Sequence, residues 1–170
     1  MGYFATPNES SAAPGRVAPL TPERITGALD SRGWNYDVDE DGDVNGNWDG
    51  HLFYFLRMGQ SEEIFMVRGR WEARIPLDMG DKILPVLNDW HKEKLFPKAV
   101  LVEFPNDGNS RVFTEVTIDC EHGISDEQLV LHIDAGINSA LQLFEQLNES
   151  FPGLQTIQTD DAPAEEQPPA

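Results

Sequence analysis

The residues best suited to chemistry are the acidic side chains of residues 37–50, DVDEDGDVNGNWDG. The spacing D-x-D-x-D-G matches the start of a calcium-binding EF-hand loop, whose sharp turn needs the glycine that Gly42 supplies. Such a loop ends in a bidentate Glu at its twelfth position, where this chain has Trp48. The candidate calcium ligands are the carboxylates of Asp37, Asp39, Asp41 and Asp43.

Tight turns between two strands are the alternative interpretation of the same segment. Glycines 42, 46 and 50 each follow Asp or Asn, and such pairs adopt the positive φ angles of hairpin turns. The residues that follow, HLFYFL, are rich in strand formers rather than helix formers. We therefore favour turns over a metal site here, with a calcium-responsive loop as the alternative.

Arg68 and Arg70 are the second group of interest, because the chain carries a net charge of −18. Alternation along residues 63–75 places both guanidinium groups on one strand face. They either neutralise nearby carboxylates or form a docking patch for another protein. Since Trp and Arg are enriched in binding hot spots, Trp71 and Trp48 are the candidate anchors beside them.

The remaining reactive side chains do not form a pattern typical of an enzyme. Histidines 51, 91, 122 and 132 are scattered without metal-ligand spacing, and His91 is expected to be a satisfied core side chain. Cys120 is the only cysteine and is expected to be a small buried residue. No phosphate-binding or dinucleotide-binding motif occurs. The sequence predicts a protein without catalytic residues or cofactor, with an uncharacterised enzyme as a lesser alternative.

Charge and hydropathy limit the expected partners and location. The chain lacks the clustered Lys and Arg that bind phosphate backbones, so nucleic acid is not expected as a partner. No apolar run is long enough to span a bilayer, so no membrane is expected either. A single cysteine suits a reducing compartment, which predicts a cytoplasmic location. The expected partner is another protein or a peptide segment, with a homodimer as an alternative.

The elements that would position these residues follow the order αβββαββα. Thr21 and Pro22 begin the first helix, and Ser125 with Gln128 forms a capping box for the last. The second helix begins near Asp81 or kinks at Pro85. The expected strands are residues 34–38, 51–58, 63–75, 99–104 and 112–120, with a hairpin turn between the last two. This order predicts one α+β domain whose mainly antiparallel sheet is packed by helices.

Composition divides the chain into three parts. Residues 1–20 are rich in Ser, Ala and Pro, and residues 154–170 combine Pro with acidic side chains. Such segments bury too little apolar surface to offset their ordering entropy, so both are predicted to be disordered. The folded domain is predicted to span residues 21–153.

The chain resembles the YbjN-domain family of bacteria, especially its actinobacterial members. The resemblance rests on five pieces in a fixed order: WDG at 48–50 before FYF, VRGRW at 67–71, NDWH at 88–91, FPK at 96–98 and DCEHG at 119–123. The family is similar in fold to type III secretion chaperones, which hold segments of partner proteins. It is described as a sensory or stress-related regulator. The resemblance thus implies a non-enzymatic, chaperone-like binding or adaptor protein.

Overall fold

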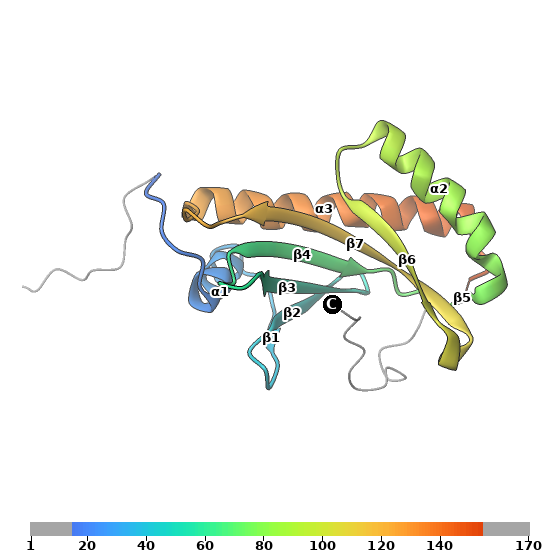
Figure 1. Cartoon of the computed structure of the whole chain (residues 1–170), viewed down its shortest axis with the longest axis horizontal. Coiled ribbons are helices and arrows are strands. Elements are labelled where there is room, and N and C mark those ends of the chain that lie inside the picture. Colours follow the sequence, from blue (N-terminus) through green and yellow to red (C-terminus); the bar gives the residue numbers. More distant parts are fainter. Residues whose placement is uncertain (1–14, 155–170) are drawn as a thin grey trace, which may run out of the picture.

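The computed structural model describes residues 15–154, so the predicted disordered tails lie mostly outside the described residues. Three α-helices, two short 3-10 helices and seven strands make up this part of the chain (Figure 1). The helices are α1 (Pro22–Ser31), α2 (Gly80–Glu93) and α3 (Asp126–Ser150), with η1 (Leu77–Met79) and η2 (Pro105–Asp107). The strands are β1 (Asp37–Val38), β2 (Val44–Trp48), β3 (His51–Met58), β4 (Ile64–Arg70), β5 (Ile75–Pro76), β6 (Lys98–Phe104) and β7 (Asn109–Asp119).

The strands form one antiparallel sheet in the order β1-β2-β3-β4-β7, and β5 and β6 both pair with β7. The predicted α+β class and the antiparallel sheet packed by helices are therefore confirmed. The β6–β7 hairpin turns through η2 and Gly108, whose φ of 69° is the left-handed conformation that glycine favours.

Two strands depart from the predicted order. β2 lies inside the segment interpreted as turns, and the predicted strand at 63–75 ends as β4 at Arg70 before the short β5. Asp49 and Gly50, with φ angles of 52° and 80°, form a two-residue turn that joins β2 directly to β3. Position 46 in β2 favours glycine, because a Cβ there would lie 2.6 Å from the Trp48 ring.

The helix ends follow local signals. The Thr21 side chain accepts a hydrogen bond from the backbone of α1, and the Ser125–Gln128 capping box at α3 is present in full. α2 begins at Gly80, one residue before the expected start, after a turn of 3-10 helix. Pro85 lies inside α2, where it lacks the backbone N–H that would bond to the preceding turn.

All three helices pack against one face of the sheet. Phe53 and Phe55 of β3 and Phe65 and Val67 of β4 share a single buried cluster with residues of every helix. α3 approaches β4 so closely that a Cβ at Gly136 would lie 2.6 Å from the Val67 side chain. The helix-covered face is therefore a closed, tightly packed core.

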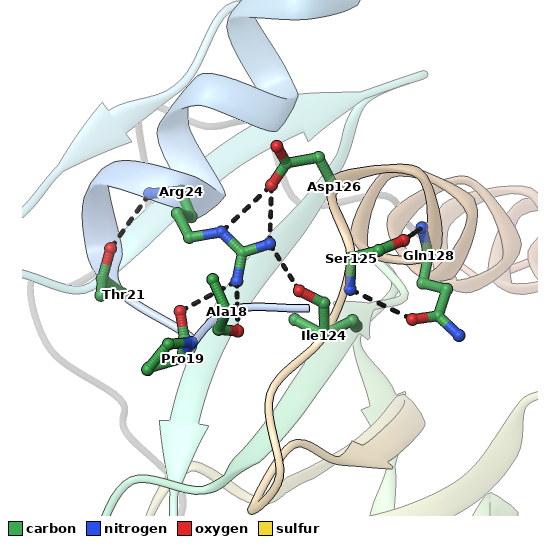
Figure 2. A network of polar contacts seen from close by, with 8 residues as sticks. All are labelled: Ala18, Pro19, Thr21, Arg24, Ile124, Ser125, Asp126 and Gln128. Carbon is green, nitrogen blue, oxygen red and sulfur yellow. Dashed lines mark hydrogen bonds and ion pairs between the residues drawn. The ribbon is translucent and has the colours of Figure 1, made fainter. Parts of the chain in front are cut away.

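Arg24 ties the N-terminal end of this fold together (Figure 2). Its guanidinium donates to the carbonyl oxygens of Ala18 at 2.6 Å, Pro19 at 2.9 Å and Ile124 at 2.6 Å. It also bonds Oδ1 of Asp126 at 2.6 Å through Nη2 and at 3.1 Å through Nε. One side chain thus joins the segment before α1 to the loop before α3.

Residues 1–20 were predicted to be disordered. For residues 15–20, the same contacts correct this prediction. Ala18 forms an antiparallel bridge with Ile124, with backbone hydrogen bonds of 3.2 and 2.9 Å. Composition suggested a tail, but backbone pairing, Arg24 and the packing of Leu20 against the core hold this stretch against the domain. Residues 1–14 lie outside the described part.

Candidate functional site

The face of the sheet away from the helices is the candidate site. Directly opposed residues of antiparallel strands share a face, so the strand pairing defines which side chains lie there. One row runs Leu52, Arg70, Phe113, Val100, and the next runs Tyr54, Arg68, Glu115, Lys98. We call these two rows, with Leu56, Met66, Val102 and Arg111 beside them, the open sheet face. None of its apolar members belongs to the buried cluster beneath the helices.

Figure 1 shows the arrangement from which this face follows: α3 runs along one side of the sheet, and α2 stands beside β6. Among residues 15–154, no helix crosses the other side of the sheet. Most apolar side chains of the open sheet face, including Leu52, Tyr54 and Val100, are partly exposed. A sheet with one half-apolar, uncovered face has room for another layer.

The open sheet face gathers cations in a strongly acidic protein. It carries Arg68, Arg70, Arg111 and Lys98, four of the chain's 12 Lys and Arg residues, together with the carboxylates of Glu115 and the adjacent Glu72. Strand pairing adds Asp37 to the row of Tyr54 and Arg68, and Asp119 to the far end of β7 on the same face. Burial raises the pKa of the Tyr54 hydroxyl, and the three arginines oppose this shift. The positive charges therefore converge around Tyr54.

Arg68 lies near the middle of this face and is short of hydrogen-bond partners. Its side chain is 13% exposed, and Nη2 lies 3.7 Å from Oε1 of Glu115. That distance is long for a charge-assisted hydrogen bond, which is typically about 2.7–2.9 Å. Its Nε is buried and has no hydrogen-bond acceptor among the described residues, a state shared only by Ser110 Oγ.

The surroundings of Arg68 explain this shortage. The guanidinium lies over the Phe113 ring, 4.6 Å from its centroid, so one side of the cation meets an aromatic face. Glu115 is shared, because Nζ of Lys98 bonds its Oε2 at 2.7 Å. Burial lowers the pKa of Arg68, whereas Glu115 and Tyr54 raise it. A carboxylate placed here would meet donors that the fold leaves largely unused.

Arg70, unlike Arg68, forms a close ion pair with a neighbouring carboxylate. Its Nε donates to Oε1 of Glu72 at 2.6 Å, and the two residues are 9% and 3% exposed. The backbone N–H of Glu72 donates in turn to Nδ1 of His51 at 3.2 Å. Of the two predicted arginines, Arg70 thus neutralises a nearby carboxylate at hydrogen-bond distance, whereas Arg68 has only the more distant Glu115.

The two predicted tryptophan anchors differ in exposure. Trp71 is 1% exposed and its Nε1 donates to Oδ1 of Asn148 in α3 at 2.9 Å, so it belongs to the core beneath the helices. Trp48 is partly exposed and packs edge-on against Trp34, Phe53 and Phe55, with each centroid distance 5.6 Å. The structure does not bring Trp71 to Arg68 and Arg70, because alternation along the chain directs it to the opposite, helix-covered face.

The acidic segment at 37–43 forms a hairpin turn. One carboxylate oxygen of Asp39 accepts the backbone N–H groups of Asp41 at 3.0 Å and Asp43 at 2.8 Å, and Gly42 has a φ of 87°. Burial raises the pKa of Asp43, and the charges of Asp39 and Asp41 raise it further. Among residues 15–154, no three His, Cys, Asp or Glu side chains are arranged to hold a metal ion. This geometry favours the turn interpretation over a calcium loop.

Cys120 and His91 are the other reactive side chains that the sequence analysis considered. Cys120 is 4% exposed, as expected, and burial raises its thiol pKa, which opposes formation of the nucleophilic thiolate. It adjoins a shallow hollow with Glu62, Glu63 and Asp119. His91 was expected in the core but is exposed, although its Nε2 accepts the backbone N–H of Ala99 at 2.9 Å.

Sequence reasoning identified Arg68 but missed the residues that surround its guanidinium group. Glu115, Phe113 and Tyr54 come from β7 and β3, and only the strand pairing brings them to Arg68. The alternation of Arg111, Phe113 and Glu115 along β7 was a usable signal of a second basic and aromatic strand face.

An antiparallel sheet with helices on one face and a half-apolar, uncovered second face defines the chain as a one-sided α+β protein. Within that class, the chain belongs to the YbjN family, described as a putative bacterial sensory transduction regulator, whose model matches residues 21–149. The predicted family and its description as a regulator are thereby confirmed.

A solved structure supports the same fold. The chain is similar to "YbjN, a putative transcription regulator from E. coli", with a TM-score of 0.70 and 12% sequence identity over 84% of this chain and 100% of that one. At this identity the likeness concerns the fold alone. No curated protein matches the sequence. No helix within residues 15–154 is both long and apolar enough to cross a membrane.

Proposed function

We propose that this protein is a non-enzymatic regulator that binds an amphipathic segment of another protein across its open sheet face. The observation that carries the proposal is Arg68, a largely buried guanidinium with an unused Nε donor on an uncovered, half-apolar surface. A segment with apolar side chains over Leu52 and Val100 would cover the sheet, and its carboxylate beside Arg68 would give the guanidinium a closer acidic partner than Glu115.

The chaperone-like holding role and the actinobacterial affinity of the chain are part of this proposal. A sheet that packs helices on one face and leaves the other uncovered supports a holding role, because an amphipathic partner helix could form the missing layer. A cytoplasmic location also belongs here, supported by a buried, unpaired Cys120.

A photo-crosslinking residue in place of Tyr54 tests the proposal in the native cell. We expect a discrete crosslinked partner protein from this position, because Tyr54 adjoins Arg68 on the open sheet face. The matched control places the same residue at Leu131, which is 67% exposed on α3. Crosslinking should also fall at least tenfold in the Arg68→Gln background. Equal crosslinking from both positions, or none from Tyr54, would contradict the proposal.

A further inference from the structure

We propose that His51 is a pH-sensitive switch, which keeps the Arg70–Glu72 ion pair closed when the imidazole is neutral and loosens the pair when the imidazole is protonated. The switch is a property of the fold, and only its consequence for binding rests on the proposed function. Three features support it: the hydrogen bond that His51 accepts, the packing around its ring, and the ion pair that lies next to it.

The hydrogen bond at His51 requires a neutral imidazole. The backbone N–H of Glu72 donates to its Nδ1 at 3.2 Å, so Nδ1 carries no proton and the ring holds its single proton on Nε2. In the protonated imidazole both nitrogens are donors, and the Nδ1–H group would face the N–H group of Glu72. Two donors cannot bond each other. Protonation of His51 therefore breaks this contact.

The packing around the ring leaves the imidazole little room to turn away. His51 is 8% exposed, and its ring lies against the Phe144 ring of α3 with a centroid distance of 4.7 Å. Burial lowers the pKa of His51, whereas the charges of Glu72 and Asp49 raise it. Asp49 belongs to the turn between β2 and β3, and Glu72 to the segment between β4 and β5. An imidazolium at this position would thus have carboxylates on two sides.

One of these carboxylates already has a cation. Nε of Arg70 donates to Oε1 of Glu72 at 2.6 Å, and both residues are buried. An imidazolium at His51 would be a second cation beside the same carboxylate. Because opposite charges attract more strongly where burial excludes water, Glu72 would be drawn toward the imidazolium and its bond to Arg70 would weaken. The loss of the contact between His51 and the Glu72 backbone would permit this movement.

A weaker ion pair would change the open sheet face, where Arg70 pairs with Leu52. Burial raises the pKa of the Tyr54 hydroxyl and the charge of Arg70 opposes that shift, so this guanidinium acts on the same surface as Arg68. Once loosened from Glu72, it would offer an acidic side chain of a bound segment a second donor group. The segment of the proposed function should therefore bind more tightly as the pH falls below 7.

Side-chain NMR of the full chain tests the switch between about pH 7.5 and pH 5.5, a range that includes the usual histidine pKa of about 6.5. The Nε–Hε signal of Arg70 and the amide signal of Glu72 should move with the same midpoint as the His51 ring. In His51→Gln, whose side-chain oxygen accepts a hydrogen bond at every pH, this step should disappear. His132→Gln is the matched control and should keep the step, because His132 bonds the carbonyl oxygen of Val116 instead.

A second variant separates the imidazole from the neighbouring carboxylate. Asp49→Asn should keep the step but move its midpoint to lower pH, because the charge of Asp49 opposes the effect of burial on the pKa of His51. A step that persists in His51→Gln, or a His51 ring that titrates while the Arg70 signal stays still, would overturn the proposal. Equal movement of the Arg24 signal, whose partners lie at the N-terminal end of the domain, would also overturn it, because the change would then be general unfolding.

The outcome for the switch is distinct from the outcome for the proposed function. Capture beside Arg68 requires no change at Arg70, so a failed titration test leaves the crosslinking result at Tyr54 unaffected. Conversely, the coupled titration of His51 and Arg70 is measured without any partner, so absence of crosslinking at Tyr54 leaves the switch in place.

Discussion

Arg24 and Arg68 are both largely buried arginines, yet they have opposite relations to their neighbours. Arg24 bonds three carbonyl oxygens and a carboxylate at the N-terminal end of the domain (Figure 2). Arg68 has one distant carboxylate, an aromatic ring and an Nε without an acceptor. The comparison separates a side chain that holds the fold together from one that the fold pairs only weakly, although sequence alone gives both the same charge.

The largest expected effect comes from removing each guanidinium in turn. Arg24→Met removes the charged donor from three carbonyl oxygens and from Asp126, and should lower the free energy of unfolding by about 2–4 kcal/mol, since hydrogen bonds to charged groups contribute about 1.5–3 kcal/mol each before solvent exposure is discounted. Arg68→Met should cost less than about 1 kcal/mol. Urea unfolding followed by tryptophan fluorescence measures both. Equal losses in the two variants would contradict the distinction between them.

Shortening the N-terminus tests whether the partners of Arg24 matter as much as Arg24 itself. Deleting residues 1–20 removes the Ala18–Ile124 bridge and two of the carbonyl acceptors, and should cost about 1–3 kcal/mol. Deleting residues 1–14 leaves every described contact in place and serves as the control. Thermal unfolding distinguishes the two, and a similar melting temperature for both deletions would show that the segment is dispensable.

A smaller effect is expected where α3 meets the sheet. Gly136→Ala places a methyl group against Val67, and overpacking of about 1–3 kcal/mol should exceed the gain in helix propensity of about 1 kcal/mol. Gly27→Ala in α1 is the matched control, because nothing lies within 4 Å of its Cβ position. It should stabilise the protein slightly. A stabilised Gly136 variant would mean that the covered face is more pliable than its packing indicates.

The smallest effect should come from acid pH, and it should act on the covered face. Burial lowers the pKa of His51 and His132, which lie against Phe144 and Phe65 beneath the helices. A histidine pKa lowered by folding favours the native state above the unfolded value of about 6.5. Stability should therefore decrease as the pH falls from 7 through 6 toward the lowered pKa values. Replacing both histidines by Gln should flatten this dependence, and an unchanged slope would assign it to other groups.

Much of the fold could be predicted because its signals are local. The Ser125–Gln128 capping box and the apolar stripe of α3 lie within a few residues of each other, and the strand at 51–58 has the predicted ends. β2 could not be predicted in the same way, because Asn45, Gly46 and Asn47 have low strand propensity. Pairing with β3 stabilises the strand from outside the segment, and the ring of Trp48, the last residue of β2, packs against Phe53 and Phe55 of β3.

The candidate site was predictable only in part for the same reason. Strand alternation correctly placed Arg68 and Arg70 on one face, but it could not show that Glu72 pairs with Arg70 and that Glu115 stays distant from Arg68. Alternation along residues 63–75 already placed Trp71 opposite Arg68 and Arg70, but its hydrogen bond to Asn148, 77 residues away, could not be predicted. Arg24 was overlooked because a charged side chain in a first helical turn is common, and its carboxylate partner is even more distant in sequence.

That distance affects how the protein emerges from the ribosome. Asp126 follows Arg24 by 102 residues, which translation at about 5–20 residues per second takes about 5–20 s to add. A ten-residue helix such as α1 is marginal in water on its own. α1 is the first helix to be synthesised. It therefore lacks the partner of its Arg24 side chain until Asp126, at the start of the last helix, has left the exit tunnel.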